Sequence, residues 1–274
     1  MDKDIHSSTF DKNYIERNKN KLSSLVYSHL TGDLENVTLN SVVDLKHYRK
    51  SPNVGADATK PKIQLITPSG PIYFKFGLTE NEVCAEIISY YLATTLDIRA
   101  AKTALAWYKD SLGIASWSIG EYVEPDDDKS YSIPDFLHLD GFFEMCLFDY
   151  LVMNEDRHAG NWCIQNNSVA PLFDHNVCFG GEEIPIDYDN FMVKLTSPFD
   201  IGAEYHQQQD KILELLLELD KAKVKAFLAK VQKITSLELP ALEKLFPKQF
   251  NLVSKLFRAR VLYMTRKVAE YEHR

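Results

Sequence analysis

The spacing of apolar residues changes twice along this chain, and these changes constrain the fold more than any other feature of the sequence. Up to about residue 123 the spacing favours strands around one helix, and from Gln207 onward it favours helices alone. The chain has 274 residues, of which 45% are apolar, so it can bury a substantial core, and its length fits one large domain or two closely packed lobes. We therefore predict an α+β fold with a small β-rich lobe over residues 1–123 and a mostly helical lobe over residues 124–274.

A hairpin is predicted in the first lobe. The apolar stretches Ile63–Ile66 and Ile72–Phe76 flank the segment Thr67–Pro71, whose proline and glycine residues are turn formers. The segment Glu80–Leu96 contains neither glycine nor proline, and its apolar residues recur at helical spacing. A helix should therefore follow the hairpin directly.

Two further strands complete the predicted sheet. Ala101–Trp107 and Ile114–Tyr122 have the composition of strands, and Asp110–Gly113 between them is interpreted as their turn. With the hairpin and the helix, these strands make a small sheet that carries one helix.

The middle of the chain has the predicted order helix, loop, strand, turn, strand. Asp140 is a plausible helix cap, and apolar residues recur at helical spacing from there to about Asn154. A polar loop, Glu155–Asn161, then precedes two short apolar runs, Trp162–Ile164 and Val169–Phe173. We expect the helix to lie in the core and the two runs to form short strands.

The last third of the chain is predicted to be a helical bundle. Helices are expected over Ile212–Leu219 and Asp220–Ile234, and a last helix carries an apolar stripe from Val253 to Val268. The leucines of the first of these helices are interpreted as core residues, because a stripe at helical spacing more often packs inside a protein than docks a partner.

Charge and apolar runs exclude several classes of function. Lysine and arginine number 31 and aspartate and glutamate 39, a formal net charge of −8, so no overall basic field favours binding to a phosphate backbone. The basic clusters Arg17–Lys21 and Lys46–Lys50 are interpreted as solvated faces, and nucleic acid is not expected as a substrate. The sequence has no apolar run of about eighteen residues, and Met1–Lys21 lacks the apolar core of a secretory signal. We expect a soluble, cytoplasmic protein that does not enter a membrane, with four cysteines that are buried thiols.

The residues that point to chemistry are Asp156, Asn161 and Asp174. The first two lie in the polar loop, and Asp174 follows the second short strand, so all three fall at one edge of a small hairpin. Phosphoryl transfer from ATP needs hard oxygen ligands for magnesium and a carboxylate that orients the acceptor hydroxyl and takes its proton. Asp156 is the candidate base, and Asn161 with Asp174 are the candidate metal ligands.

Each of these residues taken alone has a simpler interpretation. Asp156 and Asn161 are residue types that stabilise turns, and Asp174 could cap the loop after it. Taken together, and preceded by an apolar helix, the three favour a functional site, because their arrangement matches a required geometry.

The sequence here resembles the HipA-like serine/threonine kinases, whose catalytic loop reads Asp-Arg-His-x-x-Asn. Asp156–His158 and Asn161 match that motif, and Ala170–Asp174 matches the family's second element, in which an Asp follows a proline and an aromatic residue. The resemblance implies that Asp156 is the catalytic base and that Asp174 binds magnesium. It also implies a two-lobed, protein-kinase-like fold with ATP and Mg²⁺ as cofactors.

The resemblance extends upstream to Tyr73–Phe76, which is similar to the strand that carries the family's nucleotide-binding lysine. Alternation along a strand puts Lys75 on the face opposite its two phenylalanine neighbours, so if these pack inside, Lys75 faces the cleft and can neutralise the phosphates of ATP. Glu86 on the next helix is the candidate ion-pair partner of Lys75, and Glu82, one turn earlier, is the alternative. Without the resemblance a solvated lysine would be the favoured interpretation, because a single lysine on a strand is usually exposed.

Two weaker assignments complete the predicted nucleotide site. The segment Ser51–Asp57 resembles the phosphate-covering loop of the family and offers Ser51 and Gly55, but a plain surface loop is an equal alternative because only one glycine is present. Glu121 and Val123 lie where a hinge between the lobes belongs, and their backbone groups are candidates for hydrogen bonds to adenine.

Three features near the motif complete the predicted site. His158 beside the base invites a general-base role, whereas the resemblance implies a structural or orienting one. His175 stands where eukaryotic protein kinases have the Phe of their Asp-Phe-Gly motif, so regulation by that Phe is not expected. Gly180–Phe199 is the expected activation or substrate loop.

The sequence as a whole predicts an ATP-dependent kinase, and most simply a HipA-like serine/threonine protein kinase. The expected partner is a protein substrate of unknown identity, and the chain itself is a candidate for phosphorylation. The alternatives are a small-molecule or lipid kinase of the same fold and a non-catalytic pseudokinase, against which the complete set of base and metal ligands argues. Met1–Lys50 is too short for the extra amino-terminal domain of longer family members, so a stand-alone kinase is expected and pairing with a DNA-binding antitoxin is left open.

Overall fold

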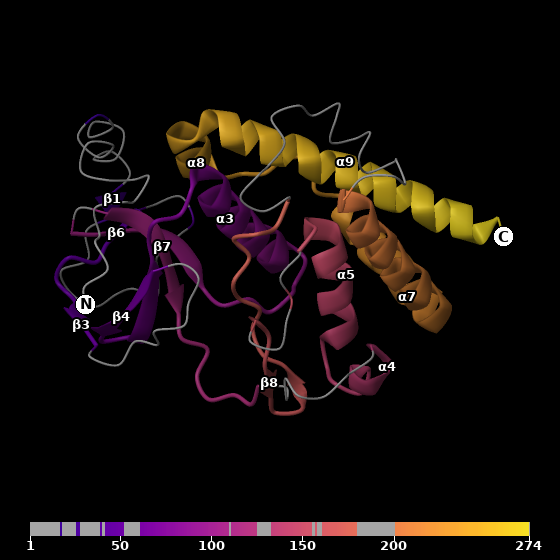
Figure 1. The fold of residues 1–274 in the computed structure, drawn as a ribbon, viewed down its shortest axis with the longest axis horizontal. Helices are drawn as coiled ribbons and strands as arrows, with labels where there is room; N and C mark the ends of the chain where they lie inside the picture. Colours follow the sequence, from indigo (N-terminus) through magenta and orange to yellow (C-terminus); the bar gives the residue numbers. More distant parts are fainter. Residues whose placement is uncertain are drawn as a thin grey trace.

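A computed structural model describes residues 17, 26–27, 39, 42–51, 61–109, 111–124, 133–154, 157, 161–179 and 201–273, with residues 26, 27, 133 and 201–209 described by their backbone alone. The described part has a β-sheet with one helix at one end of the molecule and a group of helices at the other (Figure 1). The predicted α+β fold of two lobes is confirmed. The boundary at residue 123 stays a prediction.

The first lobe is built on a sheet that has seven strands among the described residues, in the order β1-β2-β6-β7-β5-β4-β3. The pairs β1–β2 and β2–β6 are parallel, and the other pairs are antiparallel. The strands are β1 (Val26–Tyr27), β2 (Val42–Asp44), β3 (Arg49–Lys50), β4 (Lys62–Thr67), β5 (Gly70–Lys75), β6 (Thr103–Tyr108) and β7 (Ser111–Trp117).

The predicted hairpin is formed by β4 and β5, which pair from Lys62 opposite Lys75 to Thr67 opposite Gly70. Gly70 has a φ of 101°, a conformation that other residues rarely adopt, so this position of the turn favours glycine. The turn formers in the sequence therefore set the register that places Lys75 at the far end of β5.

The prediction for β7 was wrong at both ends, because Gly113 is not a turn residue. It lies within β7, opposite Ala106 of β6. A Cβ atom at Gly113 would lie 2.0 Å from the carbonyl oxygen of Lys75, so only glycine lets β7 approach β5 this closely. The strand consequently begins at Ser111 and ends at Trp117, earlier than the predicted Ile114–Tyr122.

The two faces of the sheet contact different groups of buried residues. Ile72 and Phe74 of β5 and Ala115 of β7 belong to a cluster that contains no residue of α3 (Glu80–Thr95). Leu105 of β6 and Ile114 of β7 belong to a second cluster that includes the buried residues of α3. The predicted helix thus covers one face of the sheet.

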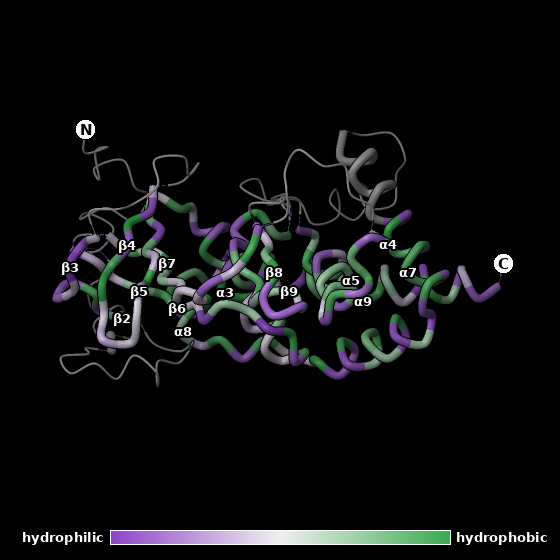
Figure 2. Tube along the Cα trace, turned by 90° about the horizontal axis from the view of Figure 1, so that it is seen from below, coloured by the Kyte–Doolittle hydropathy of each residue, from purple (hydrophilic) through white to green (hydrophobic). Residues whose placement is uncertain are grey.

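The second cluster continues from α3 into the helical lobe, so the two lobes share one core. The long helix α9 contacts α3, α5 and α7 and runs along most of the molecule (Figure 1). In Figure 2 the hydrophobic colour lies mostly on central strands and helices, while the last turns of α9 before the C-terminus are mostly hydrophilic. The helices are α4 (Ile133–Phe136), α5 (Phe142–Val152), α7 (Ile201–Val231), α8 (Pro240–Leu245) and α9 (Pro247–Glu272).

Two predicted helix starts differ from the structure. Gly141, not Asp140, is the cap of α5 and has a φ of 81°, while the backbone of Asp140 pairs with Asn167 and Val169. The helix predicted from Ile212 is part of α7, which starts at Ile201. The predicted break at Asp220 is confirmed, because the backbone leaves helical geometry there and the Asp220 carboxylate accepts a hydrogen bond from the backbone N–H of Lys223.

The strand predicted over Val169–Phe173 is shorter than expected. Its start pairs with the preceding run as a small hairpin of β8 (Ile164–Gln165) and β9 (Ser168–Val169). Leu172 instead bonds to the first lobe, accepting from the N–H of Ala101 and donating to the carbonyl of Arg99, both at 2.8–2.9 Å. The chain that leads to Asp174 is thus tied to the sheet.

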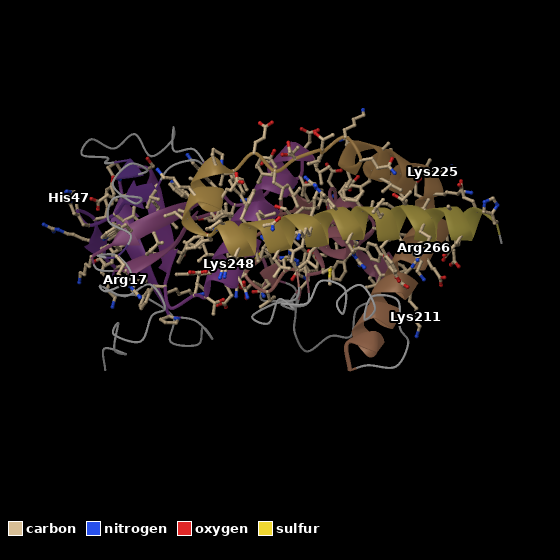
Figure 3. All side chains as sticks on the ribbon, turned by 90° about the horizontal axis from the view of Figure 1, so that it is seen from above. Arg17, His47, Lys211, Lys225, Lys248 and Arg266 are labelled. Atoms are coloured by element: carbon tan, nitrogen blue, oxygen red, sulfur yellow. The ribbon has the colours of Figure 1, made fainter. Side chains whose placement is uncertain are left out.

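The surface of the described chain agrees with the charge pattern of the sequence. Lys46, His47, Arg49 and Lys50 are exposed, as expected for a solvated basic face. Basic side chains of α7 and α9, among them Lys225 and Arg266, also lie on the outside of the helical lobe (Figure 3). Among the described helices, none combines the length and the apolar character needed to cross a membrane.

Candidate functional site

Lys75 ends β5 with its side chain buried on the α3 side of the sheet. Its neighbours Phe74 and Phe76 lie in the cluster on the opposite face, as alternation along a strand requires. The Lys75 ammonium is 3.6 Å from a carboxylate oxygen of Glu86 on α3 and 2.7 Å from a carboxylate oxygen of Asp174. We call Lys75, Glu86 and Asp174 the lysine cluster.

Glu86, and not Glu82, is the glutamate beside Lys75. Glu82 is used at the start of α3, where it accepts from the N–H of Thr79 at 2.7 Å while the Thr79 hydroxyl accepts from the N–H of Glu82. Glu86 lies one turn later, with 1% of its surface exposed, and also accepts from the N–H of His175 at 2.9 Å. The same oxygen of Glu86 therefore faces Lys75 and the residue after Asp174.

Asp174 is held in the left-handed backbone region, with a φ of 59°. This conformation is uncommon for a residue with a side chain, and it occurs most often at sites that the surrounding structure holds in place. The Asp174 side chain is 28% exposed, so it faces both Lys75 and solvent. A group that approached from solvent could reach Asp174 and Lys75 together.

The charges in the lysine cluster shift one another's pKa values. Burial opposes ionisation of Asp174, but Lys75 and, further away, Lys62 hold the pKa of Asp174 below its usual value. Burial also disfavours the charged form of Lys75, yet Glu86 and Asp174 raise the pKa of Lys75. Burial raises the pKa of Glu86 despite the neighbouring lysine. Lys75 and Asp174 are therefore charged at neutral pH, and Glu86 takes up a proton most easily.

A second set of polar groups surrounds Arg157, the middle residue of the motif. The guanidinium donates from Nε and Nη2 to the two carboxylate oxygens of Asp149 on α5, each at 2.9 Å. Nη1 donates to the backbone carbonyls of Asn161 at 2.6 Å and Phe173 at 3.1 Å, and Nη2 lies 3.1 Å from Nε2 of His175. We call Arg157, Asp149 and His175, with these two carbonyls, the arginine network.

His175 joins the two sets of residues. Its backbone N–H bonds to Glu86, and its ring packs edge-on against Phe148 of α5. Burial, together with the charges of Arg157 and Lys75, holds the pKa of His175 well below its usual value, so the ring is neutral. Because Nε2 faces an Arg157 donor, we assign the ring proton to Nδ1.

Asn161 and the Asp174 segment converge on one nitrogen atom. Nη1 of Arg157 binds the carbonyl of Asn161 and that of Phe173, the residue before Asp174. An amide and a carboxylate offer hard oxygen atoms, and magnesium is usually bound through one or two carboxylates together with substrate phosphates. The residues present fit magnesium in that mode, although the described chain contains no group of three His, Cys, Asp or Glu residues arranged to hold a metal alone.

Several backbone groups of the predicted hinge residues already have partners within the chain. Both backbone groups of Val123 bond to Ile164, at 2.9 Å from its N–H and 2.8 Å to its C=O, so the predicted contact of its N–H with adenine is already occupied within the chain. The carbonyl of Glu121 accepts from the side-chain amide of Gln165 at 3.0 Å. The side chains of Tyr122 and Val123 are 45% and 68% exposed, so an apolar ring bound at the hinge would pack against these two side chains.

The other predicted residues are only partly described. Ser51 is buried and donates its N–H to the carbonyl of Gln64 at 2.7 Å, which extends the pairing of β3 with β4. Gly55, Asp156, His158 and the loop Gly180–Phe199 lie outside the described residues.

Asp149 and Asn154 were missed by sequence reasoning. The Asp149 carboxylate accepts from the side-chain amide of Asn154 at 2.9 Å as well as from Arg157. The available signal was a carboxylate within an apolar helix just before the motif, since such a residue needs a partner when it is buried. Nothing in the spacing indicated that this partner would be Arg157.

Comparisons with known proteins show the fold. No family model and no curated protein matches the sequence. The structure is similar to a chain in the complex of the toxin–antitoxin proteins HipA and HipB with operator DNA from Shewanella oneidensis MR-1, with a TM-score of 0.51 and 13% identity over 82% of this chain and 68% of that chain. It is also similar to the proinflammatory kinase CtkA of Helicobacter pylori, with a TM-score of 0.49 and 16% identity over 82% of this chain and 99% of that one. The chain has a HipA-like, protein-kinase-like fold, and similarity at these identities is evidence of fold alone.

Proposed function

We propose that this chain is an ATP-dependent phosphotransferase, and within that class a HipA-like serine/threonine protein kinase that uses Mg²⁺. The observation that carries the proposal is the lysine cluster, in which a strand lysine lies 3.6 Å from a helix glutamate and 2.7 Å from the aspartate after a short hairpin. Phosphoryl transfer needs a cation for the phosphates and a metal-binding carboxylate beside it. The kinase-like fold supports the same reaction class.

Each residue of the proposed site has one task. Lys75 binds phosphate oxygens of ATP, and Glu86 holds Lys75 in place. Asn161 and Asp174 would hold Mg²⁺, which when bound neutralises charge on the phosphates. The exposed side chains at the hinge, Tyr122 and Val123, would pack against adenine.

Asp156 is the proposed base. The acceptor hydroxyl oxygen attacks the γ-phosphorus, the bond from that phosphorus to the bridging oxygen breaks, and ADP leaves. The hydroxyl proton passes to the Asp156 carboxylate. The motif Asp156–Asn161 supports this assignment, because it puts the base directly before Arg157 and five residues before Asn161, a proposed metal ligand.

The test is two measurements on the purified chain with ATP labelled on its γ-phosphate. Asp156→Asn keeps the shape of the side chain and removes its charge, so transfer should fall about 100- to 10,000-fold while stabilisation by Mg-ATP survives. Asp140→Asn, which removes an exposed carboxylate outside the site, is the control and should transfer at the wild-type rate.

The position of the label decides the acceptor class. Label on this chain or on proteins of a lysate supports a protein kinase, whereas label on a lipid or metabolite alone supports the other kinase classes. Nucleotide-dependent stabilisation without any transfer would contradict the enzymatic proposal and leave a binding module.

A further inference from the structure

Arg157 uses every donor of its guanidinium inside the protein. A guanidinium carries five N–H donors, and it has no acceptor. The acceptors around Arg157 are the two carboxylate oxygens of Asp149, the carbonyls of Asn161 and Phe173, and a ring nitrogen of His175, at 2.6 to 3.1 Å. Arg157 therefore has no donor left to bind a phosphate group.

Asp149 is placed where its own helix disfavours it. It lies in the last turn of α5 (Phe142–Val152), and a negative charge near the carboxyl end of a helix is opposed by the helix dipole. The carboxylate is compensated there by the Arg157 fork and by the side-chain amide of Asn154 at 2.9 Å. Asp149 thus binds Asn154, two residues after the end of α5, and Arg157 inside the motif.

Arg157 links Asp149 to the segments that hold the proposed metal ligands. One nitrogen, Nη1, binds the carbonyl of Asn161 itself and the carbonyl of Phe173, which directly precedes Asp174. Loss of the Asp149 carboxylate would leave a buried guanidinium with two donors unpaired, and the guanidinium would have to move toward another acceptor. Both carbonyls would then lose their fixed position.

We propose that Asp149 is a positioning residue for phosphoryl transfer, which holds Asn161 and Asp174 in place through Arg157 and makes a phosphorylated residue unnecessary for assembly of the site. The inference rests on the proposed function. In many kinases a phosphorylated activation loop becomes ordered when its phosphate pairs with arginine. In this chain an internal carboxylate, that of Asp149, already pairs with the arginine.

The test compares two substitutions on α5. Asp149→Asn removes the negative charge of the arginine network. Glu144→Gln removes a half-buried carboxylate of the same helix that lies outside the network. For each variant and the wild type, both the transfer rate and the nucleotide-dependent rise in melting temperature are measured against Mg²⁺ concentration. The same measurements are repeated on wild-type protein after treatment with a phosphatase.

We expect Asp149→Asn to raise the Mg²⁺ concentration needed for half-maximal stabilisation by ATP by about 10- to 100-fold, as is typical when a residue that orients metal ligands is lost. Glu144→Gln should leave it unchanged, and phosphatase treatment should leave wild-type transfer unchanged. A folded Asp149→Asn variant with wild-type Mg²⁺ dependence would overturn the positioning role, and loss of transfer after phosphatase treatment would overturn the independence from phosphate.

Asp149→Glu is a second variant, used in case Asp149→Asn does not fold. It keeps the charge and lengthens the side chain, so it should fold with a smaller rise in the Mg²⁺ requirement, and an unchanged requirement would again contradict the proposal. If the wild-type protein shows neither transfer nor Mg²⁺-dependent binding of ATP, the proposed function fails instead, which separates the two outcomes.

Discussion

The lysine cluster and the arginine network are joined through His175, but their charged groups are paired in different ways. Lys75 is a single ammonium between two carboxylates, one of which, on Asp174, is 28% exposed. Arg157 instead has a separate acceptor for each of its donors, and the side chain of its carboxylate partner, Asp149, is only 14% exposed. In the lysine cluster, Lys75 can replace an internal partner with a ligand, whereas Arg157 in the arginine network cannot.

This difference follows from the chemistry of the two cations. An ammonium is a compact charge on a flexible stem, so Lys75 can release Asp174 and bind a phosphate oxygen with little rearrangement. A guanidinium is a planar fork whose bonds have fixed directions, so Arg157 holds the chain segments it binds in one arrangement. The site thus combines an exchangeable binding half with a fixed supporting half, and each of the following experiments tests that contrast.

The largest effect is expected from Arg157→Met. Removal of the guanidinium leaves Asp149 as a buried charge without its ion-pair partner, and breaking a buried pair in this way typically costs about 3–5 kcal/mol. The free energy of unfolding, measured by urea denaturation, should fall by that amount. Lys230→Met, which removes an exposed ion pair with Asp97, is the control, and its effect should stay below about 1 kcal/mol. A small effect at Arg157 would show that the network is not a fixed support.

The next effect concerns ligand binding by the exchangeable half. ATP with Mg²⁺ at a hundredfold excess over its dissociation constant should stabilise the wild-type protein by about 2.7 kcal/mol, because the ligand binds only the folded state. Asp174→Asn should abolish the part of this stabilisation that depends on Mg²⁺, since it removes the charge of a proposed metal ligand. Thermal denaturation with ATP alone and with Mg-ATP separates the two parts. Equal melting temperatures for the wild type with and without Mg-ATP would contradict nucleotide binding.

A smaller loss of stability is expected from Lys75→Met. The remaining carboxylates, Glu86 and Asp174, would repel each other, but burial already raises the pKa of Glu86, so Glu86 can take up a proton when the lysine is absent. We expect a loss of about 1–2 kcal/mol in urea denaturation, together with a transfer rate at least about 100-fold lower. If Lys75→Met destabilised the protein as much as Arg157→Met, the two halves would not differ in the way we infer.

How much of this site the sequence predicted depends on how local each signal is. The hairpin that positions Lys75 follows from turn formers within it, and the start of α3 at Glu80 follows from the helical spacing that begins there. These features were predicted because the residues that determine them are neighbours in the chain. Asn161 and Asp174 were predicted as metal ligands through a motif of fixed spacing, and this stays a prediction.

The features that were missed depend on contacts with residues that are distant in the sequence. The backbone groups of Val123 are hydrogen-bonded to Ile164. Glycine is required at position 113 because the carbonyl of Lys75 on a neighbouring strand lies too close for a side chain. The partner of Asp149 is likewise set by the path of the loop after α5, which apolar spacing does not encode. Sequence reasoning therefore pointed to the proposed ligand-binding residues more readily than to the residues that hold them in place.

The smallest effect distinguishes the two glutamates on α3 that were alternatives for the partner of Lys75. Glu82→Gln should change the free energy of unfolding by less than about 1 kcal/mol, because glutamine can replace glutamate in the capping arrangement with Thr79. It should also leave the transfer rate close to that of the wild type, since the Glu82 carboxylate accepts from Thr79 at the helix start and, at 3.4 Å, from the side-chain amide of Asn176, and does not lie beside Lys75. Glu86→Gln is the matched variant on the same helix: it removes the charge 3.6 Å from Lys75, so the transfer rate should fall although the shape of the side chain is kept. Both rates are measured with labelled ATP at a temperature at which both variants are folded. A greater loss of transfer in Glu82→Gln than in Glu86→Gln would mean that Lys75 changes its partner when ATP binds, and that the exchangeable half of the site includes the start of α3.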